Sequence, residues 1–213
     1  MTHSLHRRGT YEELKDEYLL LVTIANGVNN SPDAKDKLRR VLDEMWDVGP
    51  VNTGSNETGT ILSGVSVDEI KQGFTKVPRI RCCFDSKEKI REMLRRLIAM
   101  DLGVSVTISG SRSDVEELCR EFGIKPHSVN LSLQVWGRTE KLPEEDIMKF
   151  ITMCGHGLIS RTLVEDTINK VKAGKMTPEQ GAVRIGTPCV CGFFNPTRAV
   201  ALLQKYVPAA GQN

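Results

Sequence analysis

The sequence predicts a mixed α/β protein of the α+β kind: a ferredoxin-like βαβαβ sheet with helices on one face, followed by a C-terminal helical subdomain. Three observations lead to this prediction. Apolar and polar residues alternate in three stretches between positions 79 and 135. Segments with helical spacing of apolar residues separate these stretches. Beyond Gly137 only helical patterns follow.

Residues 1–75 are expected to form a mainly helical N-terminal region. A capping box at Thr10–Glu13 predicts a helix that continues to about residue 25. A second helix is expected between Ser31 and Gly49, with proline in its first turn. The glycine-rich stretch 51–64 predicts a loop with a short hairpin near Thr60–Leu62. Another capping box predicts a short helix over residues 66–74.

Residues 76–140 form the predicted βαβαβ core. Its strands are expected at 79–84, 104–109 and 129–135, with a helix in each connection. Parallel strands that are covered on both faces usually have unbroken runs of apolar residues, whereas apolar and polar residues alternate along these strands. Helices are therefore expected on one face of the sheet only.

The second face of this sheet is predicted to be polar. It carries Arg79, Arg81, Ser105, Thr107, Asn130, Ser132, Gln134 and Trp136. A solvated face is one interpretation, and a face that lines a ligand site is another. Because an exposed tryptophan is unfavourable in water, the face around Trp136 is also a candidate for contact with a protein partner or a second copy of the chain.

Composition narrows the class of protein. Twenty-nine basic and 27 acidic residues give a net charge of +2, and only 5% of residues are aromatic. This balance lacks the basic footprint of a nucleic-acid-binding protein. The apolar run at residues 19–22 is too short for a signal sequence or a membrane span. A cytoplasmic protein with no nucleic-acid or membrane partner is therefore expected.

The cysteines of the predicted helical subdomain, residues 141–213, suggest a metal centre. Cys154 and His156 are separated by one residue, as are Cys189 and Cys191. Three thiolates and one imidazole are a suitable tetrahedral set for zinc. Three thiolates also suit a 4Fe-4S iron–sulfur cluster with a fourth ligand from histidine or elsewhere. Each pair precedes a predicted helix, whose N-terminus favours anionic sulfur.

Other interpretations of these cysteines stay open. The spacing matches neither the usual zinc pattern nor the usual ferredoxin run. Cys154 also completes an apolar helical stripe, which is typical of a buried thiol without a metal. Cys189 and Cys191 are a candidate redox pair. Six cysteines in 213 residues are too few for a disulfide scaffold.

Five further residues are candidates for binding an anion or a substrate. They are Ser111, Ser113, His127, Asn195 and Arg198. The serines precede a predicted helix, where hydroxyls and amides bind anions, although ordinary helix capping explains them too. His127 lies in a turn, and Asn195 and Arg198 begin the last helix next to the predicted metal. If the N-terminal tail, which contains His3 and His6, is ordered, His6, Arg7 and Arg8 would be placed to cover an anionic ligand.

The function expected from these features is that of a cytoplasmic metal-binding protein, with zinc or an iron–sulfur cluster at Cys154, His156, Cys189 and Cys191. It would act as a redox protein or as an enzyme on an anionic substrate. The alternative is a non-enzymatic regulatory module that binds a small molecule, with a structural zinc or no metal. No G-x-S-x-G or H-E-x-x-H motif is present, which argues against standard serine hydrolases and zinc proteases.

Overall fold

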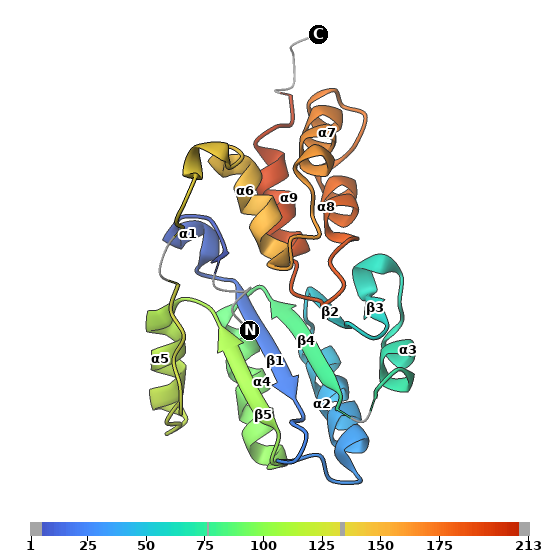
Figure 1. Ribbon diagram of the computed structural model, residues 1–213, viewed down its shortest axis with the longest axis vertical. Helices are drawn as coiled ribbons and strands as arrows, with labels where there is room; N and C mark the ends of the chain where they lie inside the picture. Colours follow the sequence, from blue (N-terminus) through green and yellow to red (C-terminus); the bar gives the residue numbers. More distant parts are fainter. Residues whose placement is uncertain (1–5, 76, 133–134, 209–213) are drawn as a thin grey trace.

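A five-stranded antiparallel sheet forms the centre of the molecule in the computed structural model, which describes residues 6–75, 77–132 and 135–208 (Figure 1). Its strand order is β3-β2-β4-β1-β5. The strands are β1 (Tyr18–Thr23), β2 (Asn52–Ser55), β3 (Gly59–Thr60), β4 (Arg79–Phe84) and β5 (Ser105–Ser109). The mixed α/β class predicted from the sequence is therefore confirmed.

The two longest helices connect strands that are not neighbours. Helix α4 (Lys87–Met100) joins β4 to β5, and both of these strands pair with β1 between them. Helix α2 (Ala34–Val48) lies between β1 and β2 in the chain, and both of these strands pair with β4. Both helices lie on the same face of the sheet and pack against each other (Figure 1).

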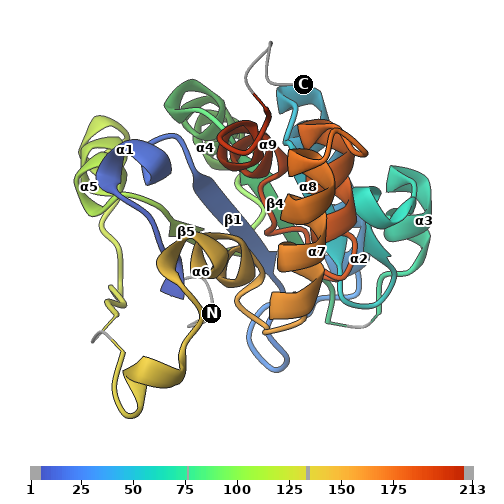
Figure 2. The ribbon, with the colours of Figure 1, turned by 90° about the horizontal axis from the view of Figure 1, so that it is seen from above.

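Four helices at the end of the chain form a separate layer: α6 (Glu145–Ile151), α7 (Arg161–Lys172), α8 (Pro178–Gly186) and α9 (Pro196–Gln204). Figure 1 shows these helices beyond the end of the sheet at which β1 begins and β4 ends, and Figure 2 shows α6, α7, α8 and α9 from above. Local signals begin these helices, since the Ser160, Thr177 and Asn195 side chains each accept a bond from the backbone of the first turn. The remaining α-helices of the described residues are α1 (Tyr11–Leu14), α3 (Val67–Gln72) and α5 (Arg112–Glu121).

Two hydrophobic cores share the sheet. The first, which we call the sheet–helix core, joins Leu20 and Val22 of β1 to residues of α2 and α4. The second, the C-terminal core, joins Leu19 and Leu21 of β1, together with Cys83 of β4, to the α6–α9 layer. Alternate residues of one strand thus enter different cores, as the pleat of a strand requires.

The predicted helix over residues 10–25 is wrong after its first turn. Helix α1 ends at Leu14, and β1 follows as an inner strand. Tyr18 to Val22 are all buried, because helices cover this strand on both faces. A short continuous apolar run fits a doubly covered strand as well as a helix. The first 75 residues therefore contribute three strands to the sheet as well as helices.

The third predicted strand, over residues 129–135, is also wrong in the part that the structure describes. Residues 129–132 and 135 belong to no strand, and Gln134 of the predicted polar face lies outside the described residues. Val129 and Leu131 are exposed, as is Trp136. No strand of the sheet pairs with the described residues of this stretch, and pairing rather than pattern forms a strand.

The prediction that helices cover only one face is corrected by the C-terminal core. Leu19, Leu21 and Cys83 point away from α2 and α4 and are buried under the C-terminal layer. Arg81, which the sequence places on the polar face, is also buried, with 5% of its surface exposed. Part of the second face is thus an interface within the chain.

Candidate metal centre

Two turns bring three of the predicted site cysteines together in the C-terminal core. Cys154 ends a 3-10 turn, Thr152–Cys154, that continues α6. Cys189 and Cys191 lie between α8 and α9. All three side chains are almost completely buried. The topology therefore places sulfurs that are 35 residues apart in the sequence in one cluster, as the two glycine-flanked motifs predicted.

The sulfurs of this thiol cluster are in contact through Cys189. The Cys189 and Cys191 Sγ atoms lie 3.8 Å apart. The Cys154 thiol is also hydrogen-bonded to Cys189. Two thiolates on one tetrahedral zinc, each at about 2.3 Å from the metal, would be about 3.8 Å apart. The observed separation equals that distance, and it is also the distance of two thiols in hydrogen-bond contact.

Backbone amides surround the three sulfurs. The N–H group of Leu158 is hydrogen-bonded to the Cys154 sulfur, while that of His156 donates to the Cys154 carbonyl oxygen. The N–H groups of Cys191 and Phe194 are bonded to the Cys189 sulfur, and that of Phe193 to the Cys191 sulfur. Hydrogen bonds from amides stabilise sulfur as an anion, because a thiolate is a much stronger acceptor than a thiol.

The pKa values of the three thiols are shifted in opposite directions. Hydrogen bonds from the Cys154 and Cys191 thiols lower the pKa of Cys189, and this effect outweighs burial, which raises it. The same bonds to Cys189, together with burial, raise the pKa of Cys154 and of Cys191. Cys189 is therefore the sulfur of the three whose surroundings most favour the anionic form.

Arg81 of β4 is a buried cation that interacts with this cluster. Its guanidinium interacts electrostatically with Cys191 and Cys189, while burial lowers its pKa. One nitrogen donates to Asn56 Oδ1 at 3.1 Å, and Nε has no hydrogen-bond partner among the described residues. Arg81 therefore offsets part of the negative charge that thiolate sulfur would bring to this site.

Gly192 holds the second cysteine turn against the sheet. It has φ +88°, and a Cβ there would meet Gly54 N at 2.5 Å, Thr53 C at 2.7 Å and Arg81 O at 2.9 Å. Only glycine fits both the left-handed conformation and this approach to backbone. The chain following it is fixed by Asn52, whose amide donates to Phe194 O at 3.0 Å.

His156 is not part of the thiol cluster in this structure. It is exposed on the turn between Gly155 and Gly157, both of which have positive φ. In residues 6–75, 77–132 and 135–208, no group of three or more His, Cys, Asp and Glu side chains is arranged to hold a metal ion. The three sulfurs converge on Cys189 and would have to close further around an ion.

The other three cysteines differ in their surroundings. Cys82 is buried in the sheet–helix core, and Cys119 is partly buried on α5. Cys83 is buried in the C-terminal core. All six cysteines are free thiols, and Cys189 and Cys191 do not form a disulfide.

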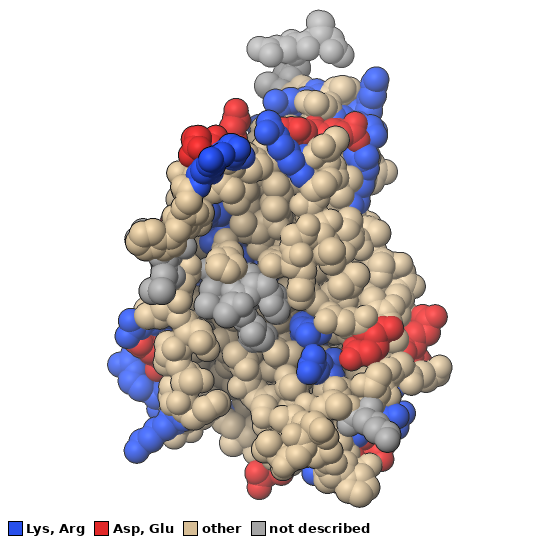
Figure 3. Space-filling model, viewed as in Figure 1, with Lys and Arg blue, Asp and Glu red and all other residues tan. Residues whose placement is uncertain are grey.

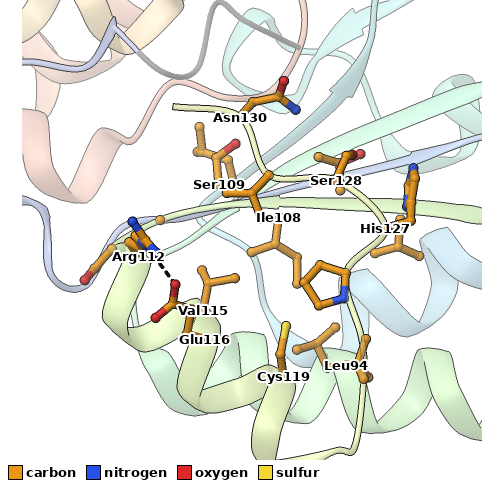
Figure 4. Close-up of a pocket in the computed structure, with 18 of the residues that line it drawn as sticks. Leu94, Ile108, Ser109, Arg112, Val115, Glu116, Cys119, His127, Ser128 and Asn130 are labelled. Carbon is orange, nitrogen blue, oxygen red and sulfur yellow. Dashed lines mark hydrogen bonds and ion pairs between the residues drawn. The ribbon is translucent and has the colours of Figure 1, made fainter. Parts of the chain in front are cut away.

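The predicted anion-binding residues separate into two places. Ser111 and His127 line a cavity of about 1700 Å³ beside β5 and α5, whereas Ser113 is exposed on α5 outside the cavity's lining (Figure 4). Asn195 caps α9, where its side chain accepts from Arg198 N at 3.0 Å. Arg198 is buried and points to the N-terminal segment rather than to the thiol cluster.

A buried ionic cluster that the sequence did not predict joins Arg7, Glu17 and Arg198. Arg7 Nη1 lies 3.0 Å from Glu17 Oε1, and Arg198 Nη1 lies 3.4 Å from the same oxygen. Arg7 also donates to the carbonyl of Phe193, and Arg198 to that of Arg8. The tail segment from His6 is thereby placed beside α9, while His3 lies outside the described residues. The pair Arg7-Arg8, followed by several acids over residues 12–17, was the available signal.

Charges of both signs occur on the face drawn in Figure 3, with no extended area of a single sign. None of the helices in the described part of the chain is both long and apolar enough to cross a lipid bilayer. Comparisons with protein-family models, with curated proteins and with solved structures gave no match. The site must therefore be interpreted from its own residues.

Proposed function

We propose that the protein binds a metal through the sulfurs of Cys154, Cys189 and Cys191. The observation that carries this proposal is the convergence of three buried sulfurs from two turns, each hydrogen-bonded to a backbone amide. Three ordinary core cysteines would not need amide donors directed at each sulfur. The 3.8 Å separation of two sulfurs favours a single zinc ion. An iron–sulfur cluster is less suited, because each cysteine binds a different iron and the sulfurs lie farther apart.

We propose that the fourth coordination position of this ion determines whether the site is catalytic or structural. A water molecule there would make the site resemble catalytic zinc sites, which keep one position open. His156 would close it after a rearrangement of its glycine-flanked turn, and the site would then be structural. Buried Arg81 next to the sulfurs supports the first arrangement, because it would attract an anionic substrate to the open position.

We further infer that the sheet is ferredoxin-like and that the protein works in the cytoplasm. The order β2-β4-β1-β5, with α2 and α4 as crossovers on one face, supports the first inference. The added strand β3 and the C-terminal layer are departures from that pattern. Six free cysteines support the second, since reducing compartments keep thiols free.

Metal analysis of matched cysteine variants tests the proposal. We expect about one zinc per chain in protein purified without oxygen, and loss of this zinc in Cys189→Ala, because Cys189 is the sulfur that touches both others. Cys82→Ala is the control, since Cys82 is equally buried but lies in the other core. Its zinc content should equal that of the wild type.

Two outcomes decide the test. Full metal content in Cys189→Ala, or a metal-free wild-type protein whose thiols bind no added zinc, would contradict the proposal. A brown protein with absorbance near ~400 nm and bound sulfide would show that the same cysteines bind an iron–sulfur cluster instead of zinc. Circular dichroism of each variant verifies that the fold is retained.

A further inference from the structure

Strand β5 forms one edge of the sheet. It pairs with β1 on one side, and no strand of the described residues pairs with its other side. Natural proteins often protect such an edge with charged residues, with proline or with a covering segment, because its backbone groups can otherwise pair with a foreign strand. The sequence of β5, SVTIS, contains neither a charged residue nor a proline. A covering segment is therefore the protection to look for.

One segment lies across a cavity from this edge. Residues 126–132, which we call the strap, come after α5 in the chain and line the cavity of about 1700 Å³ together with residues 106–109 of β5. Figure 4 shows Asn130 of the strap above Ile108 of β5. None of the strap residues belongs to a helix or a strand. The strap therefore lies near the edge of the sheet without being part of the sheet.

The strap has the residue pattern of the strand that it faces. Apolar and polar residues alternate in β5, and they alternate again over residues 129–132. In β5 the apolar residues Val106 and Ile108 pair with Val22 and Leu20, which lie in the sheet–helix core. Residues that are opposite each other on neighbouring strands share one face of the sheet. A strand added beside β5 in this phase would therefore place its own apolar residues on the face of α2 and α4.

The apolar part of the cavity lies on that same face. Side chains of α4 and α5 line it: Leu97, Ile98, Val115 and Cys119. Helix α5 belongs to this side of the sheet, because its Leu118 is buried in the sheet–helix core. Val129 and Leu131 of the strap are 65% and 58% exposed. Moving these two side chains from water into the apolar part of the cavity is favourable.

The connection through α5 suits a sixth strand that is parallel to β5. In Figure 1 the chain runs upward along β5, downward along α5 and upward again in the segment that follows. Ion pairs of Lys87 with Glu117 and of Arg91 with Glu121 hold α5 beside α4. A unit of β5, α5 and the strap would thus cross the sheet in the same direction, and on the same face, as the unit of β4, α4 and β5. The two crossovers would have the same hand, as crossovers between parallel strands almost always do.

We propose that the strap closes onto the outer edge of β5 as a sixth, parallel strand, and that the structure shows the open arrangement. In the closed arrangement Val129 and Leu131 fill the apolar part of the cavity beside Val106 and Ile108. Every second amide of the strap bonds to β5, and the edge of the sheet is covered. The thiol cluster lies in the C-terminal core, on the other face of the sheet, so closure does not depend on a metal there.

Amide hydrogen exchange, measured by NMR, tests the closed arrangement. Alternate amides over residues 128–132 should exchange at least roughly tenfold more slowly than in an unstructured chain, because closed molecules then outnumber open ones by that factor. Leu131→Asp should abolish this protection, since it would place a carboxylate among apolar side chains. Asn130→Asp is the matched control, because it adds the same charge at the next position, which points away from the cavity in the closed strand. Both positions are exposed, so neither change puts the fold at risk.

Alkylation of Cys119 provides a second, chemical readout. This thiol lines the cavity, and it is the one cysteine of the six that is not fully buried. Closure of the strap covers it. Iodoacetamide should therefore modify Cys119 at least roughly tenfold faster in Leu131→Asp than in the wild type, by the same population ratio, and Asn130→Asp should match the wild type. Peptide mass spectrometry identifies the modified cysteine.

Three results would overturn the proposal. The first is exchange of all strap amides in the wild type at the rate of an unstructured chain. The second is an equal effect of Leu131→Asp and Asn130→Asp on exchange and on alkylation. The third is protection that rises with protein concentration together with a dimer in light scattering, because the edge of β5 would then be covered by a second copy of the chain rather than by the strap.

Discussion

At the scale of single residues, side chains far apart in sequence hold the N-terminal segment and the C-terminal layer together. Glu13 is an example. Its carboxylate accepts from Thr10 N at 3.0 Å and from the ammonium groups of Lys149 and Lys205, each at 3.0 Å. One carboxylate thus caps α1 and joins it to α6 and to the residue after α9. The capping contact could be predicted from the capping box Thr10–Glu13. The contacts with the two lysines could not, because these lysines lie 136 and 192 residues away in the sequence.

Glu13 predicts a defined dependence of stability on pH. The backbone hydrogen bond from Thr10, with further contributions from Lys205 and Lys149, lowers the pKa of Glu13 to about 2. A depressed pKa stabilises the fold above the unfolded value of about 4.3, and this stabilisation is lost as the pH falls toward 2. After solvent screening, Glu13→Gln should cost about 1–2 kcal/mol at pH 7.

Urea unfolding of Glu13→Gln and wild type at several pH values checks this prediction. The difference between them should shrink steadily between about pH 4.5 and pH 2, because the wild-type carboxylate becomes protonated there. Glu140→Gln, at an exposed position, is the control. A difference that stays constant over this interval would show that charge is not the cause.

A second residue-scale prediction concerns Gly192. Gly192→Ala should cost about 2–4 kcal/mol, because it combines a left-handed backbone with overlap against Gly54 and Thr53. Gly123→Ala is a matched control: its φ is +65°, but no described atom lies within 4 Å of the added Cβ, so about 1 kcal/mol is expected. Denaturant unfolding measures both. Equal costs would mean that the approach of this turn to the sheet is not tight.

At the scale of elements, most helices were predictable, apart from the one expected over residues 10–25, and strand partners were not. The capping signals at Ser66, Ser86, Ser160 and Thr177 mark helix starts that the structure contains, because caps act within one turn of the chain. Strand β1 could not be identified, because its apolar run is buried by two helical layers that lie far along the chain. The prediction of a strand over 129–135 was wrong for the opposite reason. The pattern suits a strand, but no strand pairs with the described residues of this stretch.

The same contrast holds for the candidate sites. The thiol cluster could be predicted from two short motifs because glycine-flanked cysteines mark turns locally. The buried ionic cluster of Arg7, Glu17 and Arg198 could not, because Arg198 lies far along the chain from the other two and only the packing of α9 against the N-terminal segment brings them together.

At the scale of the whole molecule, β1 belongs to both hydrophobic cores, and this predicts a single cooperative unfolding transition. Leu20 and Val22 pack in the sheet–helix core, and Leu19 and Leu21 in the C-terminal core, so neither core can open without disrupting one strand. Phe150→Ala, a change confined to the C-terminal core, should therefore destabilise both cores equally, by about 3–5 kcal/mol.

Two probes of urea unfolding in the Trp136→Phe background, with a zinc chelator present, test this cooperativity. Fluorescence of Trp46 in α2 reports the sheet–helix core, and alkylation of Cys189 and Cys191, located by mass spectrometry, reports the C-terminal core. Both midpoints should coincide and should shift together in Phe150→Ala, while Leu158→Ala, at a half-exposed position, should shift neither. Cysteines that react at lower urea than the fluorescence change would mean that the C-terminal layer opens by itself. Because one strand supplies both cores, the coincident result is the one expected.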